Sequence, residues 1–119
     1  MSNINEAHFK VGDITVIRFV VRRMLSTVAV DTRLREVTAS PPMDGPNTVL
    51  DFSQVEFISS AVLNRLIVLD RAISSMGGKL VLCGLSSSLR DLFSMTRLDQ
   101  VFQIVDDQDG ALRQFELTA

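Results

Sequence analysis

The sequence predicts an α/β fold, with a small mixed, mostly parallel β-sheet, an N-terminal hairpin and about four helices. Short apolar runs of strand length alternate with longer segments whose apolar residues recur every three or four positions. Glycine and proline clusters separate these segments, as is typical of turns. The 119 residues suit one domain, so we expect a flexible N-terminus over residues 1–6 and a single domain over residues 7–119.

The first part of the chain predicts a hairpin and a helix. Strands near residues 8–11 and 14–20 flank Gly12-Asp13, a dipeptide typical of a tight turn. Apolar residues at helical spacing then predict a helix within "STVAVDTRLREVTAS", where Ser26 or Thr27 can serve as the cap. The two prolines that follow cannot continue that helix and end it.

The middle of the chain carries the strongest pattern. "TVLDFS" is a short apolar run suited to a buried strand, and residues 61–76 form a clear amphipathic helix. Gly77-Gly78 ends this helix, because glycine accepts positive φ. The side chains expected on its core-facing side are Val62, Leu66, Leu69, Ile73 and Met76.

The last part predicts two further strand and helix pairs. "KLVLCG" is a buried strand, and "SSSLRDLFSMT" is a helix in which Ser88 and Asp91 stand at capping-box separation. "VFQIV" is a final strand, and "DDQDGALRQFE" a final helix whose acidic start suits the positive end of the helix dipole. The predicted order is therefore β-β-α-β-α-β-α-β-α. Strands separated by helices are expected to be parallel, with right-handed crossovers.

Composition and charge exclude several classes of function. The formal charge is −2 without a basic block, so no nucleic-acid partner is expected. His8 and Cys83 form no ligand set of metal-site spacing, and we expect neither a metal nor another cofactor. No convergent acid, base and nucleophile indicates an enzyme. A single cysteine, no bilayer-length apolar run and no secretion signal favour a cytoplasmic protein away from membranes.

Residues 48–112 resemble the STAS domain, the fold of the bacterial anti-sigma factor antagonists. The resemblance is carried by "VLDFSQVEFI" running into a serine-capped helix, then "GGKLVLCG" and then "LRDLFSMTRLDQVF". In that family the segment matching "FISSAVL" often has the order Phe-Ile-Asp-Ser-Ser-Gly-Leu. The serine after the aspartate is phosphorylated there by a partner kinase, which is itself the anti-sigma factor. The resemblance thus implies Ser60 as the phosphorylation site, with Ser59 as the alternative.

Three residues depart from the family pattern. Ser59 replaces the acid, Val62 replaces the glycine, and Arg97 stands where a glycine is common. The missing acid bears most on the kinase reaction, because a serine cannot carry the charge that would orient the hydroxyl or hold a metal. Family members with Ser-Ser-Ala in place of Asp-Ser-Ser do occur. A serine at a strand-to-helix junction is also a favoured N-cap, a role compatible with phosphorylation.

The resemblance implies an anti-sigma factor antagonist that binds an anti-sigma serine kinase and releases it when Ser60 is phosphorylated. Leu63 and Ile67 lie off the core-facing side of their helix, so we expect them to form a docking stripe next to the serines. The alternative, that other elements cover these two side chains, stays open. The expected partner-binding residues are Ser59, Ser60, Leu63, Asn64, Ile67 and Arg71.

The alternative function is an unphosphorylated STAS scaffold or sensor component of a larger signalling assembly, and Ser59 in place of the acid favours it. We expect a monomer or weak dimer, and whether a phosphatase resets the serine is open. Asp51 is expected to form hydrogen bonds near the Ser60 junction rather than to act as a general acid or base. Arg22 and Arg23 are expected to be solvated, with cation supply to a partner or phosphate as the alternative.

Overall fold

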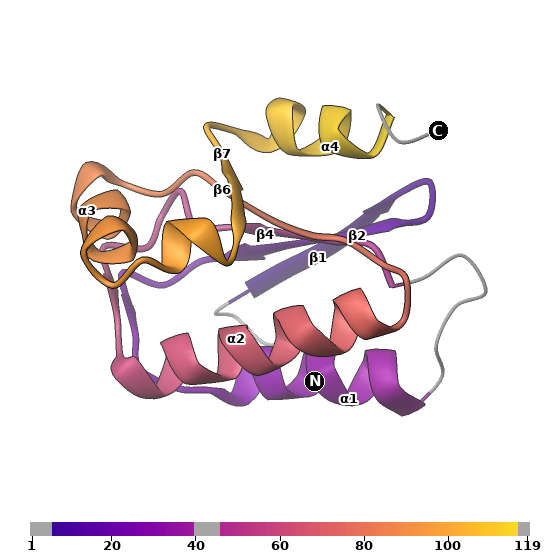
Figure 1. The fold of residues 1–119 in the computed structure, drawn as a ribbon, viewed down its shortest axis with the longest axis horizontal. Helices are drawn as coiled ribbons and strands as arrows, with labels where there is room; N and C mark the ends of the chain where they lie inside the picture. Colours follow the sequence, from indigo (N-terminus) through magenta and orange to yellow (C-terminus); the bar gives the residue numbers. More distant parts are fainter. Residues whose placement is uncertain (1–5, 40–45, 117–119) are drawn as a thin grey trace.

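The computed structural model describes residues 6–39 and 46–116, and within them the α/β fold, the N-terminal hairpin and four helices are confirmed (Figure 1). Of the flexible N-terminus expected over residues 1–6, residues 1–5 lie outside the described residues, and Glu6 begins the first strand. Most of the proline-containing segment that was expected to end the first helix, residues 40–45, also lies outside them.

The described residues form two sheets and four helices. The main sheet consists of β1 (Glu6–Val11), β2 (Ile14–Phe19), β4 (Thr48–Asp51), β6 (Leu80–Cys83) and β7 (Gln103–Val105). The second sheet consists of β3 (Arg23–Met24) and β5 (Phe57–Ile58). The helices are α1 (Val28–Ala39), α2 (Ser60–Ser75), α3 (Ser87–Met95) and α4 (Gln108–Glu116), and a 3₁₀ turn, η1 (Leu98–Gln100), precedes β7.

The strand order in the main sheet is β1-β2-β4-β6-β7. β1 and β2 are antiparallel, with Val11 opposite Ile14 across a turn in which Gly12 has a φ of +61°. The pairs β2–β4, β4–β6 and β6–β7 are parallel, because helices carry the chain back between these strands. The predicted hairpin and the predicted parallel pairing are both confirmed.

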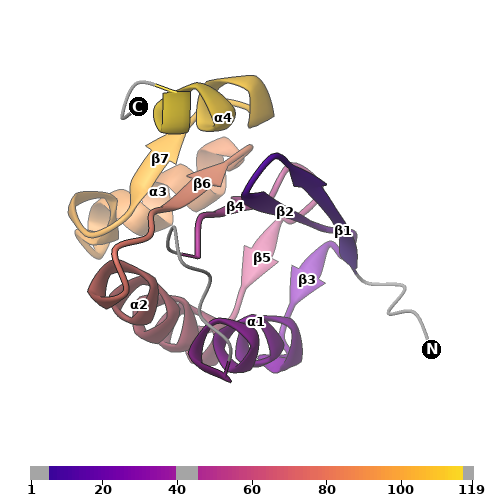
Figure 2. The ribbon, with the colours of Figure 1, turned by 90° about the vertical axis from the view of Figure 1, so that its right-hand side faces the viewer.

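The sheet has helices on both faces. α1 and α2 cover one face and α4 covers the other (Figures 1 and 2). Successive strand residues point to opposite faces, so each buried strand contributes to two cores. The larger core lies on the α1 and α2 side and contains Ile17, Leu50 and Leu82 with Val62, Leu66, Leu69 and Ile73. The smaller core lies under α4 and contains Val16, Val49, Val81, Cys83 and Ala111.

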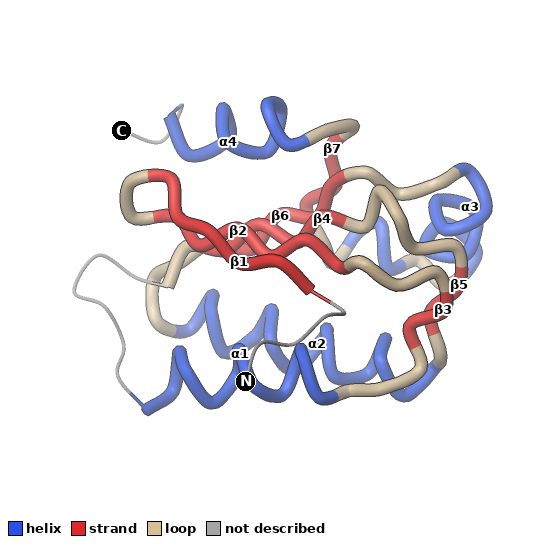
Figure 3. Tube along the Cα trace, turned by 180° about the vertical axis from the view of Figure 1, so that it is seen from behind, coloured by secondary structure: helices blue, strands red, loops and turns tan. Residues whose placement is uncertain are grey.

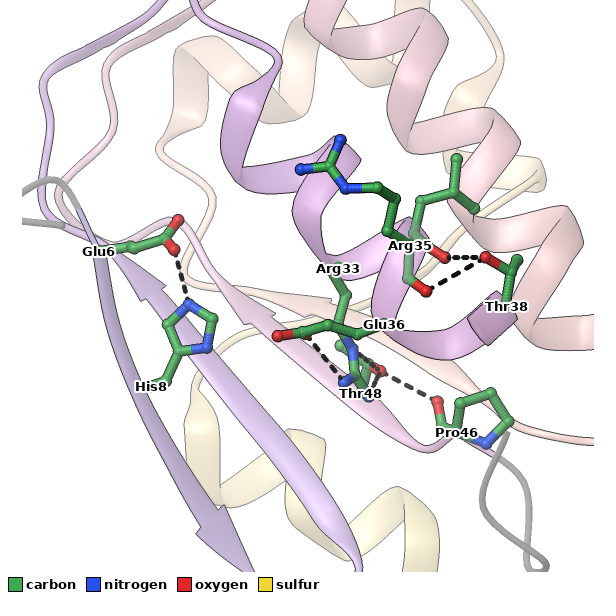
Figure 4. A network of polar contacts seen from close by, with 9 residues as sticks. Glu6, His8, Arg33, Arg35, Glu36, Thr38, Pro46 and Thr48 are labelled. Atoms are coloured by element: carbon green, nitrogen blue, oxygen red, sulfur yellow. Dashed lines mark hydrogen bonds and ion pairs between the residues drawn. The ribbon is translucent and has the colours of Figure 1, made fainter. Parts of the chain in front are cut away.

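A buried arginine ties α1 to the sheet. The guanidinium of Arg33, a residue that is 9% exposed, donates hydrogen bonds to Thr48 Oγ1 at 2.9 and 3.2 Å (Figure 4). The Thr48 hydroxyl in turn donates to the carbonyl of Pro46 at 3.0 Å. Because a buried guanidinium without acceptors would be costly, this chain of bonds holds α1 in one position over β4.

Two features differ from the sequence-based prediction. β3 and β5 are additional strands of two residues each, too short for any alternation of apolar and polar residues to reveal them. The N-cap of α3 is Ser86, whose Oγ accepts a hydrogen bond from Leu89 N at 3.2 Å, and not Ser88. Three consecutive serines have the same capping chemistry, so the backbone conformation decides which of them caps.

Arg97 has left-handed backbone angles, with φ 61° and ψ 19°. This conformation costs roughly 1–2 kcal/mol for a residue with a Cβ and nearly nothing for glycine. We expect Arg97→Gly to raise the free energy of unfolding by up to about 1 kcal/mol in urea titrations, since the greater freedom of glycine in the unfolded chain offsets part of the relief. The control, Asp91→Gly inside α3, is expected to lower it by about 0.5 kcal/mol. Equal losses in both variants would contradict the strain at Arg97.

Among the residues that the structure describes, none of the helices combines the length and hydrophobicity that crossing a bilayer requires.

Candidate functional site

The two serines at the start of α2 have different environments. Ser59 is the N-cap, with extended backbone angles (φ −72°, ψ 158°), and its Oγ accepts a hydrogen bond from Val62 N at 3.2 Å. Ser60 is the first helical residue and is exposed, and its hydroxyl takes part in no hydrogen bond within the described residues. Capping and chemical availability therefore belong to two separate side chains.

The second sheet holds this junction in place. β3 and β5 pair in parallel, with Met24 opposite Ile58 (Figure 3). Ser59 N donates to the Met24 carbonyl at 3.0 Å, and Ser59 Oγ lies 3.5 Å from the Leu25 carbonyl oxygen, to which it donates. The turn after β3 thus lies directly against the start of α2, although Leu25 and Ser59 are 34 residues apart.

Exposed apolar side chains lie on the segments that meet at this junction. Leu25, Val28 and Phe57 are 55%, 59% and 45% exposed. Leu25 and Val28 line a groove of about 390 Å³ whose wall also includes Met24. Single exposed apolar residues are ordinary, whereas a group beside a groove is typical of an interaction surface. We call Leu25, Val28 and Phe57 the junction patch.

The arginines predicted to follow the second strand flank this patch. Arg22 Nε donates to Glu56 Oε2 at 2.9 Å, and both side chains are exposed. The Arg23 guanidinium lies over the Phe57 ring, 5.2 Å from its centroid. Both arginines are solvent-exposed, as expected, and each already has a neighbour of complementary charge or an aromatic face.

An ion pair joins α1 to α2 one helical turn beyond the serines. Arg65 Nε donates to Asp31 Oδ1 at 2.6 Å, and this hydrogen bond is the main reason why the pKa of Asp31 lies below its usual value. The bond holds the first turn of α1, which carries Val28, beside the first turns of α2. The ion pair therefore fixes the position of Val28, one member of the junction patch, relative to the start of α2.

The docking stripe expected on α2 is only partly open. Asn64 and Arg71 are exposed, whereas Leu63 and Ile67 are half-buried and pack against the larger core. Val68 is 40% exposed and lies on the open face of α2. Its helical spacing from Asn64 and Arg71 is a sequence signal that places Val68 on the same face as these two residues. Leu63 lies within one turn of Ser60, so the structure brings the two together. A binding role for these residues stays a prediction.

Asp51 accepts hydrogen bonds, as expected, but away from the Ser60 junction where they were expected. Its carboxylate accepts from Ser53 N and from Gln108 Nε2, each at 2.8 Å, and lies 3.5 Å from Arg18 Nε. Burial acts to raise the pKa of Asp51, yet the hydrogen bonds from Ser53 and Gln108 hold the pKa below its usual value. None of these partners belongs to the serine junction. Asp51 instead ties the start of α4 to the sheet.

The thiol of Cys83 has no reactive character. Burial, with a further contribution from the carboxylate of Asp51, raises its pKa to about 12. The thiol is therefore protonated at neutral pH and is a poor nucleophile and metal ligand. Over residues 6–39 and 46–116, no three histidine, cysteine or acidic side chains are grouped so as to hold a metal ion.

The family of this fold follows from comparison with known families. Residues 13–111 match the STAS domain. The chain belongs to the STAS domain family. The match begins at the hairpin turn and reaches into α4, so it includes the second sheet, both serines and the junction patch.

Named relatives of this STAS domain are distant in sequence. One is the Bordetella bronchiseptica protein named "Putative anti-sigma factor antagonist BtrV", 26% identical over 81 residues that span 68% of this chain and 70% of that protein. An anti-sigma-factor antagonist (STAS) domain protein from Planctomyces limnophilus superposes with a TM-score of 0.77 at 22% identity, covering 95% and 98% of the two chains. The anti-sigma factor antagonist SpoIIAA, in its unphosphorylated form, gives a TM-score of 0.67 at 13% identity, covering 93% and 97%. The two structural likenesses establish the shared fold.

Proposed function

We propose that this STAS domain is an anti-sigma factor antagonist that binds an anti-sigma serine kinase and releases it when Ser60 is phosphorylated. The observation that carries the proposal is the exposed Ser60 hydroxyl, which is free of the capping role and follows Phe57 of the junction patch by three residues. The relatives named as anti-sigma factor antagonists support the same class of partner.

The folded domain is suited to accept a phosphate at this position. A phosphoserine adds about −1.5 to −2 charges at neutral pH. Ser60 is the first residue of α2, where the unpaired amides and the helix dipole favour an anion by about 0.3–1 kcal/mol at an exposed site. Ser59 already satisfies the amide of Val62, so the cap does not depend on the Ser60 hydroxyl. Phosphorylation should therefore leave the fold intact.

The effect of the phosphate falls on the partner instead. A kinase surface that covers the junction patch must remove water from Leu25, Val28 and Phe57, and from Ser60 beside them. A neutral hydroxyl tolerates this, whereas removing water from a phosphate without a paired cation costs several kcal/mol. The complex is thus expected to dissociate through local electrostatics, with no conformational change in the STAS domain.

In the transfer step the domain is the substrate. Ser60 Oγ attacks the γ-phosphorus of ATP, the bond to the departing ADP oxygen breaks, and the hydroxyl proton passes to a base. The STAS domain has Ser59 and no carboxylate next to the acceptor. The base and the ligands of the nucleotide-bound magnesium must therefore come from the kinase.

Phosphorylation with the cognate kinase and ATP tests the proposal. We expect one phosphate on the wild-type protein, located on Ser60 by mass spectrometry, and none on Ser60→Ala. The control is Ser59→Asn, which removes the other hydroxyl but keeps a capping side chain, and it should be phosphorylated normally. A phosphate on Ser59, or an equal amount on Ser60→Ala, would contradict the assignment of the acceptor.

Ser59 in the acid position also favours a second candidate function, an unphosphorylated STAS scaffold or sensor in a larger signalling assembly. A pull-down with wild type and Ser60→Asp separates the two functions. The switch predicts that only the wild type retains an anti-sigma-type kinase. Absence of phosphate together with equal partner retention by both proteins would favour the scaffold.

A further inference from the structure

β1 is an edge strand that offers a backbone surface. It pairs with β2 on one side, and in the described part of the chain no strand lies on its other side (Figure 2). All its residues after Glu6 are exposed. An edge strand leaves a row of N–H and C=O groups unpaired, which is a template for a further strand.

The hairpin determines which of these groups point outward. Val11 and Ile14 flank the two-residue turn and, as in other hairpins of this length, exchange both backbone hydrogen bonds. The direction of bonding alternates along an antiparallel strand. Residues 7, 9 and 11 therefore bond toward β2, and Glu6, His8 and Lys10 present their backbone groups outward.

The side chains of these three outward-bonding residues also share one face. Glu6, His8 and Lys10 lie opposite Phe19, Ile17 and Thr15 of β2. Their order along the strand is acid, histidine, base. The charges on the two sides of His8 are therefore opposite in sign, an order that we call antisymmetric about His8. The other face carries Ala7, Phe9 and Val11, and Phe9 and Val11 are 39% and 41% exposed.

Glu6 has an incomplete set of partners. Its Oε1 accepts a hydrogen bond from His8 Nε2 at 2.7 Å, while Oε2 is buried and has no hydrogen-bond partner within the described residues (Figure 4). The side chain as a whole is 8% exposed. Among the described residues, the ring of His8 is therefore the one hydrogen-bond partner of this carboxylate.

We propose that two copies of this protein associate through antiparallel pairing of their β1 strands, with His8 opposite His8 of the second copy. Both main sheets then form one continuous sheet. In this register Glu6 lies opposite Lys10 of the second copy, and Lys10 lies opposite Glu6 of the second copy. Two pairs of opposite charge therefore face each other across the interface. On the other face Ala7 lies opposite Phe9 of the second copy.

Charge selects this register over its neighbours. If the antiparallel strands paired with residue 6 opposite residue 6, two glutamates would lie opposite each other. If they paired with residue 10 opposite residue 10, two lysines would lie opposite each other. Parallel pairing in register would place Glu6 opposite Glu6 and Lys10 opposite Lys10 of the second copy. Like charges directly opposite are unfavourable and opposite charges favourable, so the antisymmetric order of β1 specifies self-pairing about His8.

The test is the mass of the purified full chain in solution, measured by sedimentation equilibrium. We expect the mass to rise from 13.2 kDa toward twice that value as the concentration increases. Lys10→Glu and Glu6→Lys should each raise the dimer dissociation constant at least about tenfold, and the double variant should restore it, because only the double variant has opposite charges facing again. The control, Asp13→Lys in the turn, makes the same charge change as Glu6→Lys outside the paired strands and should dimerise normally.

Amide hydrogen exchange gives a second measurement that does not depend on any variant. The outward amides of residues 8 and 10 should exchange more slowly as the concentration of wild-type protein rises, while the amide of Asp13 should not change. A monomer at all concentrations, a double variant that dimerises no better than the single ones, or concentration-independent exchange at residues 8 and 10 would overturn the proposal.

Discussion

Replacing Leu25 by aspartate is expected to lower the affinity for the proposed anti-sigma kinase partner at least about 100-fold, which corresponds to about 2.8 kcal/mol. Leu25 is 55% exposed, so a carboxylate at this position remains hydrated in the free domain and changes its stability little. In the complex the same carboxylate would be buried without a partner beside Ser60. Isothermal titration calorimetry with the purified kinase measures the loss, and thermal unfolding checks that the variant is folded.

The control for this experiment is Val11→Asp. Val11 is 41% exposed, but it lies at the tip of the β1–β2 hairpin, at the opposite end of the molecule from the start of α2 (Figures 1 and 3). Binding of the kinase should therefore be unchanged in this variant. Equal affinity of the Leu25→Asp variant and the wild type would show that the junction patch is not the kinase-binding surface.

The docking stripe on α2 can be separated from the junction patch by the same two measurements. Leu63→Asp and Ile67→Asp are expected to weaken kinase binding as well. Because both side chains pack against the larger core, each variant is also expected to lower the free energy of unfolding by about 1–2 kcal/mol. Lost stability with unchanged affinity in a folded variant would show that these residues serve the core alone.

Replacing Gly84 by alanine is expected to lower the free energy of unfolding by roughly 2–5 kcal/mol. Gly84 has a φ of +74°, and a Cβ there would lie 2.9 Å from Ser53 N and 3.0 Å from Asp51 Oδ1. These two atoms are joined by the hydrogen bond of 2.8 Å that helps to hold the buried Asp51 carboxylate. The added methyl group must displace the backbone at Ser53 or break this bond, and chemical denaturation measures the cost.

Gly77→Ala is the matched control for this variant. Gly77 has a similar φ of +80°, but a Cβ there would have no atom within 4 Å. This variant carries only the conformational cost of positive φ, roughly 1–2 kcal/mol. The difference between the two variants measures the close approach of Gly84 to Asp51 and Ser53. Equal losses would mean that this contact relaxes without cost.

The sequence by itself determined the elements of the main sheet and singled out Ser60 as the proposed acceptor. Gly12-Asp13, the apolar runs of β4 and β6 and the helical period of α2 are local signals that each element carries alone. The parallel strand order follows from the helices between them. The resemblance to the STAS family depends on motifs in chain order, which is also a property of the sequence, and comparison with the family confirmed it.

Only the tertiary structure decided what surrounds Ser60. β3 and β5 have two residues each, and their pairing joins segments too far apart in the chain for any local pattern to report it. That pairing places Leu25 against Ser59, and the backbone angles at Ser59 make it the cap and leave Ser60 open. The helical period likewise places Leu63 off the core-facing side of α2, but its burial depends on the other elements packed nearby. Exposure is a property of the packed chain, because each side chain is covered or left open by residues distant from it in sequence.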